Sequence, residues 1–281
     1  MDFKNFLHEQ EMNECVVAAV RLKDHIYLAK NRDRGYKAKV EVHHELINGV
    51  EIMVWFDTDT DWSEGMNEYG IGLVNSSLLV VKDEKEAKEA KNGVKKKKMT
   101  TDGLKIRKAL SHKNLQDVID TLLGKNNGGK AVSGQTIVSD GKDVYVLEIP
   151  KKYPPTVTKV PQDSLVTVRT NHGLHHKKVG YITGKKKESS HSRLRLAQEN
   201  LEKAKNPKNI LDLLRKKSSD DPFLNPYRTR TDFNMQTTGQ ILLDLTHKTV
   251  TIRMDRKEGQ YMGLKNKLPD SHKPKIKLHV I

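Results

Sequence analysis

The sequence predicts an α+β fold in which helices cover the outer faces of stacked antiparallel sheets. Short β-rich runs come in hairpin-like groups, and segments with helical spacing come in pairs between those groups. The chain has 281 residues, which is enough to bury one large core or two modest ones. We therefore expect a single domain rather than a string of small ones.

The strands are predicted from runs rich in β-branched and aromatic residues that are bounded by turn residues. The clearest hairpin has Asp140 and Gly141 between two apolar runs, because Asp-Gly favours a tight turn. The predicted strand segments, in chain order, are 15–22, 25–31, 51–56, 71–81, the hairpin 134–149, 164–172 and the closing hairpin 239–254.

Two pairs of helices are predicted from apolar residues at helical spacing and from residues typical of helix ends. The segment 114–124 is a clear example, since it begins with an asparagine and ends with a glycine. The predicted helices are 100–111, 114–124, 190–204 and 208–218.

The chain is strongly basic, with a formal net charge of +15, and only 35% of its residues are hydrophobic. Much of the charge lies in a Lys-rich insertion at 82–99 and in the stretch 175–187, both expected to face solvent. These patches leave open an anionic partner such as nucleic acid, a membrane surface or an acidic protein. The sequence has no interleaved aromatic residues for base stacking and no pattern typical of a DNA- or RNA-binding module.

The ends of the chain and its cysteine content bound the cellular setting. Residues 1–14 are acidic and lack the apolar stretch of a signal peptide, and no run reaches the length of about 20 apolar residues that spans a membrane. One cysteine suits a reducing compartment. We therefore expect a cytoplasmic protein; the sequence leaves a homo-oligomer open.

Cys15 is the only cysteine, and it starts an apolar run directly after the acidic leader. Alone, it is typical of a small buried core residue. Its second interpretation, as a nucleophile, depends on polar residues near the ends of later strands. These residues lie in four stretches: AKNRDRG (29–35), EGMNEYGIGLVNSSL (64–78), VRTNHG (168–173) and SSHSRLR (189–195).

In order and approximate spacing, Cys15 and these stretches resemble the N-terminal-nucleophile (Ntn) cysteine hydrolases. The relevant branch includes choloylglycine (bile salt) hydrolases, penicillin V acylases, acid ceramidase-like amidases and isopenicillin-N acyltransferase. The resemblance runs from Cys15 to the closing hairpin, and the Gly-Met-Asn-Glu stretch, followed by an asparagine, is its most specific part. It implies a four-layer αββα sandwich of two antiparallel sheets with helices on the outer faces.

The resemblance also implies roles for individual residues. Cys15 matches the nucleophile, and Asp33 matches the carboxylate that holds the nucleophile's free α-amino group. Asn75 and Asn171 match the groups that stabilise the oxyanion. Arg193 matches an arginine that sets the charge around the thiol and the carboxylate.

One position departs from the pattern. The family usually has an arginine three residues before the aspartate, where this chain has Lys30, and Arg32 lies between the two. Lysine keeps the positive charge but lacks the planar fork of arginine. The charge-partner role is therefore open between Lys30 and Arg32.

The chemistry implied is hydrolysis or acyl transfer at a linear amide bond of a small molecule or short peptide, without a metal or organic cofactor. An N-terminal cysteine carries its own base, because an α-amine has a pKa near ~7.7 to 8.0. The scheme requires self-cleavage between Glu14 and Cys15, which makes 1–14 a removable leader and 15–281 the mature domain. The alternative is a catalytically degenerate scaffold that acts as a basic binding protein for nucleic acid or an assembly partner.

Four other motifs are weaker. The stretch 57–68 places acidic residues as an EF-hand loop does, but Trp62 stands where the glycine is required, so a solvated acidic loop is expected. His172, His175 and His176 lack further zinc ligands with a suitable spacing and are expected on the surface or along the site. The pair at 43–44 is expected in a loop, and 127–130 in a turn.

Overall fold

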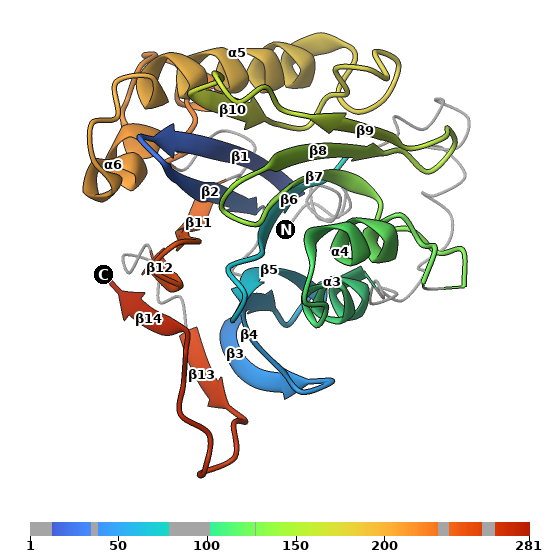
Figure 1. The fold of residues 1–281 in the computed structure, drawn as a ribbon. Coiled ribbons are helices and arrows are strands. Elements are labelled where there is room, and N and C mark those ends of the chain that lie inside the picture. Colours follow the sequence, from blue (N-terminus) through green and yellow to red (C-terminus); the bar gives the residue numbers. More distant parts are fainter. Residues whose placement is uncertain (1–12, 35–38, 79–101, 127, 230–235, 255–261) are drawn as a thin grey trace, which may run out of the picture.

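Two β-sheets packed face to face form the centre of the molecule (Figure 1). The computed structural model describes residues 13–34, 39–78, 102–126, 128–229, 236–254 and 262–281. The six-stranded sheet has the order β10-β1-β2-β11-β12-β14. Its strands are β1 (Asn13–Leu22), β2 (His25–Arg34), β10 (Val166–Arg169), β11 (Gln236–Asp244), β12 (Thr249–Met254) and β14 (Lys277–Val280).

The second sheet has eight strands in the order β13-β3-β4-β5-β6-β7-β8-β9. Most of it is a meander, in which consecutive strands pair antiparallel. The connections are short except the one from β6 to β7, which spans residues 77–133. Its strands are β3 (Val40–Ile47), β4 (Val50–Asp57), β5 (Trp62–Asn67), β6 (Gly72–Ser76), β7 (Gly134–Ser139), β8 (Val144–Ile149), β9 (Thr156–Lys159) and β13 (Met262–Asn266).

Helices cover the outer face of each sheet. The helices α3 (Asp102–Leu110) and α4 (Leu115–Leu122) share a buried apolar cluster with the eight-stranded sheet. The helices α5 (Gly184–Leu201) and α6 (Ile210–Arg215) share another with the six-stranded sheet (Figure 1). Short 3-10 turns at η2 (Pro207–Asn209) and η3 (Pro222–Leu224) precede and follow α6. A third cluster lies between the sheets, and these three apolar layers confirm an α+β fold of αββα type.

The prediction of purely antiparallel sheets is wrong at one edge of each sheet. β13 pairs parallel with β3, and β14 pairs parallel with β12. Both are short, mostly exposed strands near the C-terminus, so they lack the apolar alternation by which strands are predicted. Each adds backbone hydrogen bonds to an edge that would otherwise be open.

Two predicted loops are strands instead. His43 and His44 lie in β3, where His43 bonds Glu41 and His44 bonds Glu51, so their polar atoms are satisfied within the sheet. The acidic stretch 57–68 runs from the end of β4 through β5, and Asp57 and other acidic side chains of this hairpin are buried. It is therefore not a solvated loop.

Some predicted segments lie wholly or partly outside the described residues. The Lys-rich insertion 82–99 and residues 1–12 of the leader lie outside them. The last two leader residues, 13–14, are part of β1.

Helix α5 begins at Gly184, whereas the sequence predicted its start at Ser190. The prediction missed the first turns because they are polar and carry no apolar periodicity. In the described part of the chain, no helix is long and apolar enough to cross a membrane.

Candidate active site

The start of β1 places Cys15 and Glu14 on opposite faces of the six-stranded sheet. Cys15 is 3% exposed and belongs to the apolar cluster between the two sheets. Side chains alternate along a strand, so Glu14 points the other way, toward α5, where it is fully buried. The Glu14–Cys15 peptide bond therefore lies between the apolar layer that holds the Cys15 side chain and the helix side of the sheet, which holds the Glu14 side chain.

On the helix side, two carboxylates meet two guanidinium groups. Glu14 and Asp33 are direct cross-strand neighbours on β1 and β2. The Glu14 Oε2 atom lies 2.6 Å from Arg193 Nη2 and 2.8 Å from Arg228 Nη2. Asp33 Oδ2 lies 3.5 Å from Arg193 Nη1, and Asp33 Oδ1 accepts a hydrogen bond of 2.7 Å from Thr237 Oγ1. All four charged side chains are fully buried, so their charges balance each other inside the protein.

Arg193 also binds the backbone at Cys15. Arg193 Nη1 donates to the Cys15 carbonyl oxygen at 3.2 Å, and Arg193 Nη2 donates to Asn171 Oδ1 at 3.1 Å. The Cys15 N–H donates to the same Asn171 oxygen at 3.1 Å. Residues more than 150 positions apart in the chain thus fix both sides of Cys15.

The two carboxylates respond differently to this environment. Burial alone would raise the pKa of Glu14, but Arg228 and Arg193 outweigh it and hold that pKa below its usual value. Burial raises the pKa of Asp33 above its usual value, although Arg228 and Arg193 act against it. Glu14 is therefore the more firmly ionised member of the pair.

On the other face, three cations of β2 lie on the same side as the thiol. Arg34 Nη1 donates to Cys15 Sγ at 3.7 Å and Arg34 Nε donates to Asp57 at 3.0 Å. Lys30 Nζ donates to Glu64 at 2.8 Å, and Arg32 binds the other oxygen of that carboxylate. Arg34 is thus the cation of this group that contacts the sulfur of Cys15.

Burial matters most for the lysine of this group. It lowers the pKa of Lys30, while the neighbouring Cys15 and Glu64 act in the opposite direction. For Glu64, burial would raise the pKa, but Arg32 and Lys30 hold it below its usual value. Lys30 and Arg32 thus share one counter-ion, and the contact to sulfur comes from Arg34 instead.

The two asparagines are already hydrogen-bonded. Asn75 Nδ2 donates to the Ser63 carbonyl at 2.8 Å, and its Oδ1 accepts from Lys30 and from Trp62. Asn171 Nδ2 donates to the Ser77 carbonyl at 3.0 Å. Their role at an oxyanion stays a prediction. For Asn171, it requires the amide to exchange Ser77 for the substrate.

The structure brings the predicted residues Cys15, Asp33, Asn171 and Arg193 together, and it links Asn75 to the same region through Lys30. Sequence reasoning missed Arg228, Arg34 and Thr237 as parts of the site. The alternation of β2 could have found Arg34, since positions 30, 32 and 34 share one face. Arg228 and Thr237 stand in no recognisable motif, and only the tertiary structure brings them to Asp33.

The histidine motif lies next to the site but does not form a metal centre. His172 is buried, bonds Ser190 and stacks on His191 with a ring-centroid distance of 3.9 Å. His175 and His176 point to Thr158 and Thr156 instead. Among the described residues, no group of three histidine, cysteine, aspartate or glutamate side chains could hold a metal ion.

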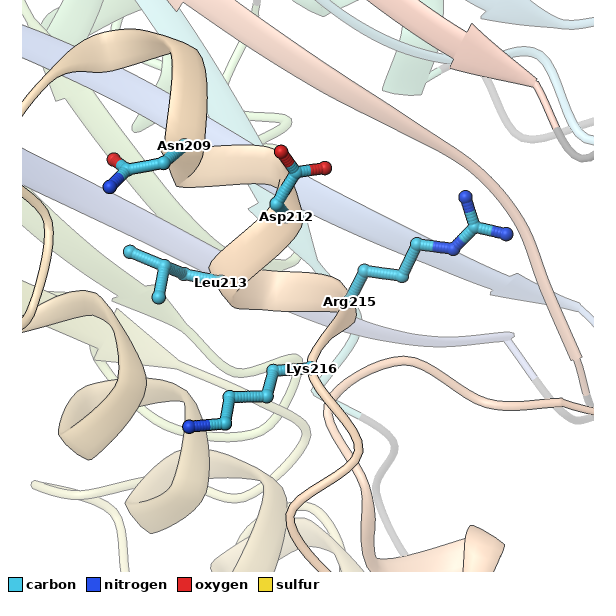
Figure 2. A pocket seen from close by; sticks show the side chains of 5 residues that line it. All are labelled: Asn209, Asp212, Leu213, Arg215 and Lys216. Carbon is cyan, nitrogen blue, oxygen red and sulfur yellow. The ribbon is translucent and has the colours of Figure 1, made fainter.

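The surface hollow shown in Figure 2 is a separate feature. It has a volume of about 450 Å³ and opens beside α6. Its lining residues are Asn209, Asp212, Leu213, Arg215 and Lys216. None of them bonds to the groups around Cys15 described above, so this hollow is not part of the candidate site.

Comparisons with known proteins give limited information. No family model matches the chain, and no curated protein matches it in sequence. The solved structures with a similar fold include the penicillin V acylase of Agrobacterium tumefaciens, which is 11% identical. That alignment covers 89% of this chain and 95% of the acylase, with a TM-score of 0.46. The assignment of a function therefore rests on the residues of the site.

Proposed function

We propose that this chain is the precursor of an N-terminal cysteine amidohydrolase or acyltransferase that acts on linear amide bonds. The observation that supports this most is the set of buried groups around one peptide bond, Glu14–Cys15. Asp33, Asn171 and Arg193 surround that bond on one side, and Arg34 reaches the thiol on the other. A core cysteine would need none of these partners.

In the proposed self-cleavage, Cys15 Sγ attacks the carbonyl carbon of Glu14. A C–S bond forms, the C–N bond breaks, and the nitrogen of Cys15 takes up the thiol proton. Water then hydrolyses the thioester and releases the leader with a carboxylate at Glu14. The mature domain is 15–281, and its first residue carries both the thiol and a free α-amine.

In turnover, that amine accepts the thiol proton, since its usual pKa lies near ~7.7 to 8.0. The nitrogen starts from a position 3.1 Å from Asn171 Oδ1, which can orient it. Asp33 lies opposite Glu14 in the strand pair and is linked to the Cys15 carbonyl through Arg193, and we propose that it helps to hold the new amine. The thiolate attacks the substrate carbonyl, the amine product leaves, and water or an acceptor amine resolves the thioester. Asn75 and Asn171 are the proposed oxyanion donors.

Intact mass spectrometry tests the proposal. We expect the purified parent to lose residues 1–14, while the Cys15→Ala variant keeps its full mass. Circular dichroism of both proteins checks that the variant folds. A folded parent that keeps its full mass would overturn the proposal and would favour the alternative, a basic binding protein on a non-catalytic scaffold.

A further inference from the structure

Two buried arginines bind the Glu14 side chain in the way that a protein binds an anionic ligand. In the proposed function, Glu14 belongs to the leader that is removed. Its carboxylate is fully buried and contacts Arg193 at 2.6 Å and Arg228 at 2.8 Å. Residues that only precede a cleavage point have no need of two buried guanidinium groups. We call Arg193 and Arg228 the arginine clamp.

Removal of the leader leaves the arginine clamp with too few negative charges. In the intact chain, Glu14 and Asp33 balance Arg193 and Arg228. After cleavage, Asp33 alone faces both guanidinium groups, and a new α-amine lies beside them. Buried charges without a partner are costly, so the vacated position favours an incoming anion.

The clamp also offers an unused donor. Arg228 Nη1 is buried and has no hydrogen-bond partner among the described residues, while the guanidinium stacks over Phe223 at 4.4 Å. The Tyr181 hydroxyl is another buried polar group with no hydrogen-bond partner in the part of the chain that the structure describes. Burial and then the Glu14 charge raise the pKa of Tyr181 well above its usual value. Glu14 binds these donors through Oε2 alone. A carboxylate that binds through both of its oxygens therefore finds more donors here than Glu14 uses.

The self-cleavage reaction indicates which anion binds at the vacated position. The first acyl group that Cys15 Sγ would carry is the glutamyl group of residue 14, whose side-chain carboxylate is bound by the clamp. We propose that the mature enzyme prefers amides whose acyl group reproduces this one, a five-carbon dicarboxylic acyl group of the glutaryl type. This inference rests on the proposed function and names its substrate class.

Hydrolysis of a glutaryl amide follows the same steps as cleavage of the leader. The thiolate of Cys15 attacks the amide carbonyl of a glutaryl amide, a C–S bond forms, and the C–N bond breaks as the amine leaves with a proton. Water then cleaves the C–S bond and releases glutarate. Throughout, the distal carboxylate stays with Arg193 and Arg228, because charge-assisted hydrogen bonds to guanidinium groups are strong and directional.

Three anilides with one leaving group test the inference on the processed protein. The p-nitroanilides of glutaric acid, of its neutral monoamide and of valeric acid have acyl chains of equal length. We expect kcat/KM to be about 10- to 100-fold higher for the glutaryl compound than for the other two, the range set by charged hydrogen bonds. We also expect free glutarate, but not valerate, to inhibit hydrolysis of the valeryl compound.

The outcomes separate this inference from the function on which it rests. A parent that keeps its leader overturns both. A parent that loses its leader but cleaves the three anilides at equal rates, or prefers the neutral ones, overturns the glutaryl preference alone. Loss of the leader together with a glutaryl preference over the neutral monoamide supports the clamp as a carboxylate subsite.

Discussion

Glu64 determines the charge balance on the thiol side of the candidate site. Its two oxygens hold Lys30 and Arg32, and all three side chains are fully buried. Because two cations depend on one carboxylate, its loss leaves both of them buried without their counter-ion. Breaking a buried ion pair from one side typically costs roughly 3–5 kcal/mol.

We therefore expect Glu64→Gln to lower the free energy of unfolding by roughly 3–5 kcal/mol in urea denaturation at pH 7. The matched control is Glu41→Gln in β3, whose partly exposed carboxylate pairs with His43 and with the exposed Lys265. Its cost should stay below about 1 kcal/mol. Equal costs for both variants would show that Glu64 has no special structural role.

At this scale, the sequence predicted the residue types of the site better than their partners. The positions of Cys15, Asp33, Asn171 and Arg193 could be predicted because each stands in a short motif, and the structure brings them together. The question between Lys30 and Arg32 could not be answered from sequence, because it depends on Glu64. That carboxylate stands 32 residues or more along the chain and meets them only across the two sheets.

At the level of elements, β5 is packed more tightly than its short sequence indicates. A Cβ atom on Gly65 would lie 2.1 Å from the Met53 carbonyl oxygen of β4, which is backbone and cannot move aside easily. Gly65 belongs to the Gly-Met-Asn-Glu stretch that follows Glu64. The absence of a side chain at this position therefore lets β5 approach β4 and sets the place of Glu64.

We expect Gly65→Ala to lower the free energy of unfolding by about 3 kcal/mol, the upper end of the usual cost of overpacking, since overpacking against backbone forces the strands apart. The control is Gly49→Ala in the β3–β4 turn, where no atom lies within 4 Å of the added Cβ and φ is +75°. Its cost should be about 1 kcal/mol, from backbone strain alone. Denaturant unfolding with matched m-values measures both, and a smaller loss at Gly65 than at Gly49 would contradict the packing argument.

Four of the strands that sequence reasoning missed share a physical cause. β3, β9, β13 and β14 are short or carry polar side chains on their faces, so their stability comes from pairing with neighbours and not from an apolar pattern. The long apolar runs of β1, β2, β4 and β11 were predicted because they are buried on both faces. Parallel pairing at the sheet edges leaves no local signal at all.

For the molecule as a whole, acid stability depends on a buried histidine near the site. His172 is 4% exposed, and burial lowers its pKa to about 4, helped by His191, Arg193 and other cations nearby. Its ring instead bonds the hydroxyls of Thr170 and Ser190 as a neutral group. Protonation would place a further positive charge beside the arginine clamp.

The sign of the pH dependence follows from this lowered pKa. Between pH 6.5 and about 4, the unfolded chain binds a proton at His172 that the folded chain does not, so stability is present above pH 6.5 and is lost as the pH falls. With allowance for solvent screening, we expect a loss of roughly 1–2 kcal/mol across this window.

Urea denaturation at several pH values from 7.5 to 4.5 should show this slope in the parent and a flatter one in His172→Gln. The variant His175→Gln, at an exposed position that bonds Thr158, should keep the parental slope. Glu51 adds a separate acid loss only below its usual range, because hydrogen bonds from His272 and His44 outweigh burial and lower its pKa to about 2. Its contribution lies mostly outside this window, so an unchanged slope in His172→Gln would show that His172 is not the group that titrates.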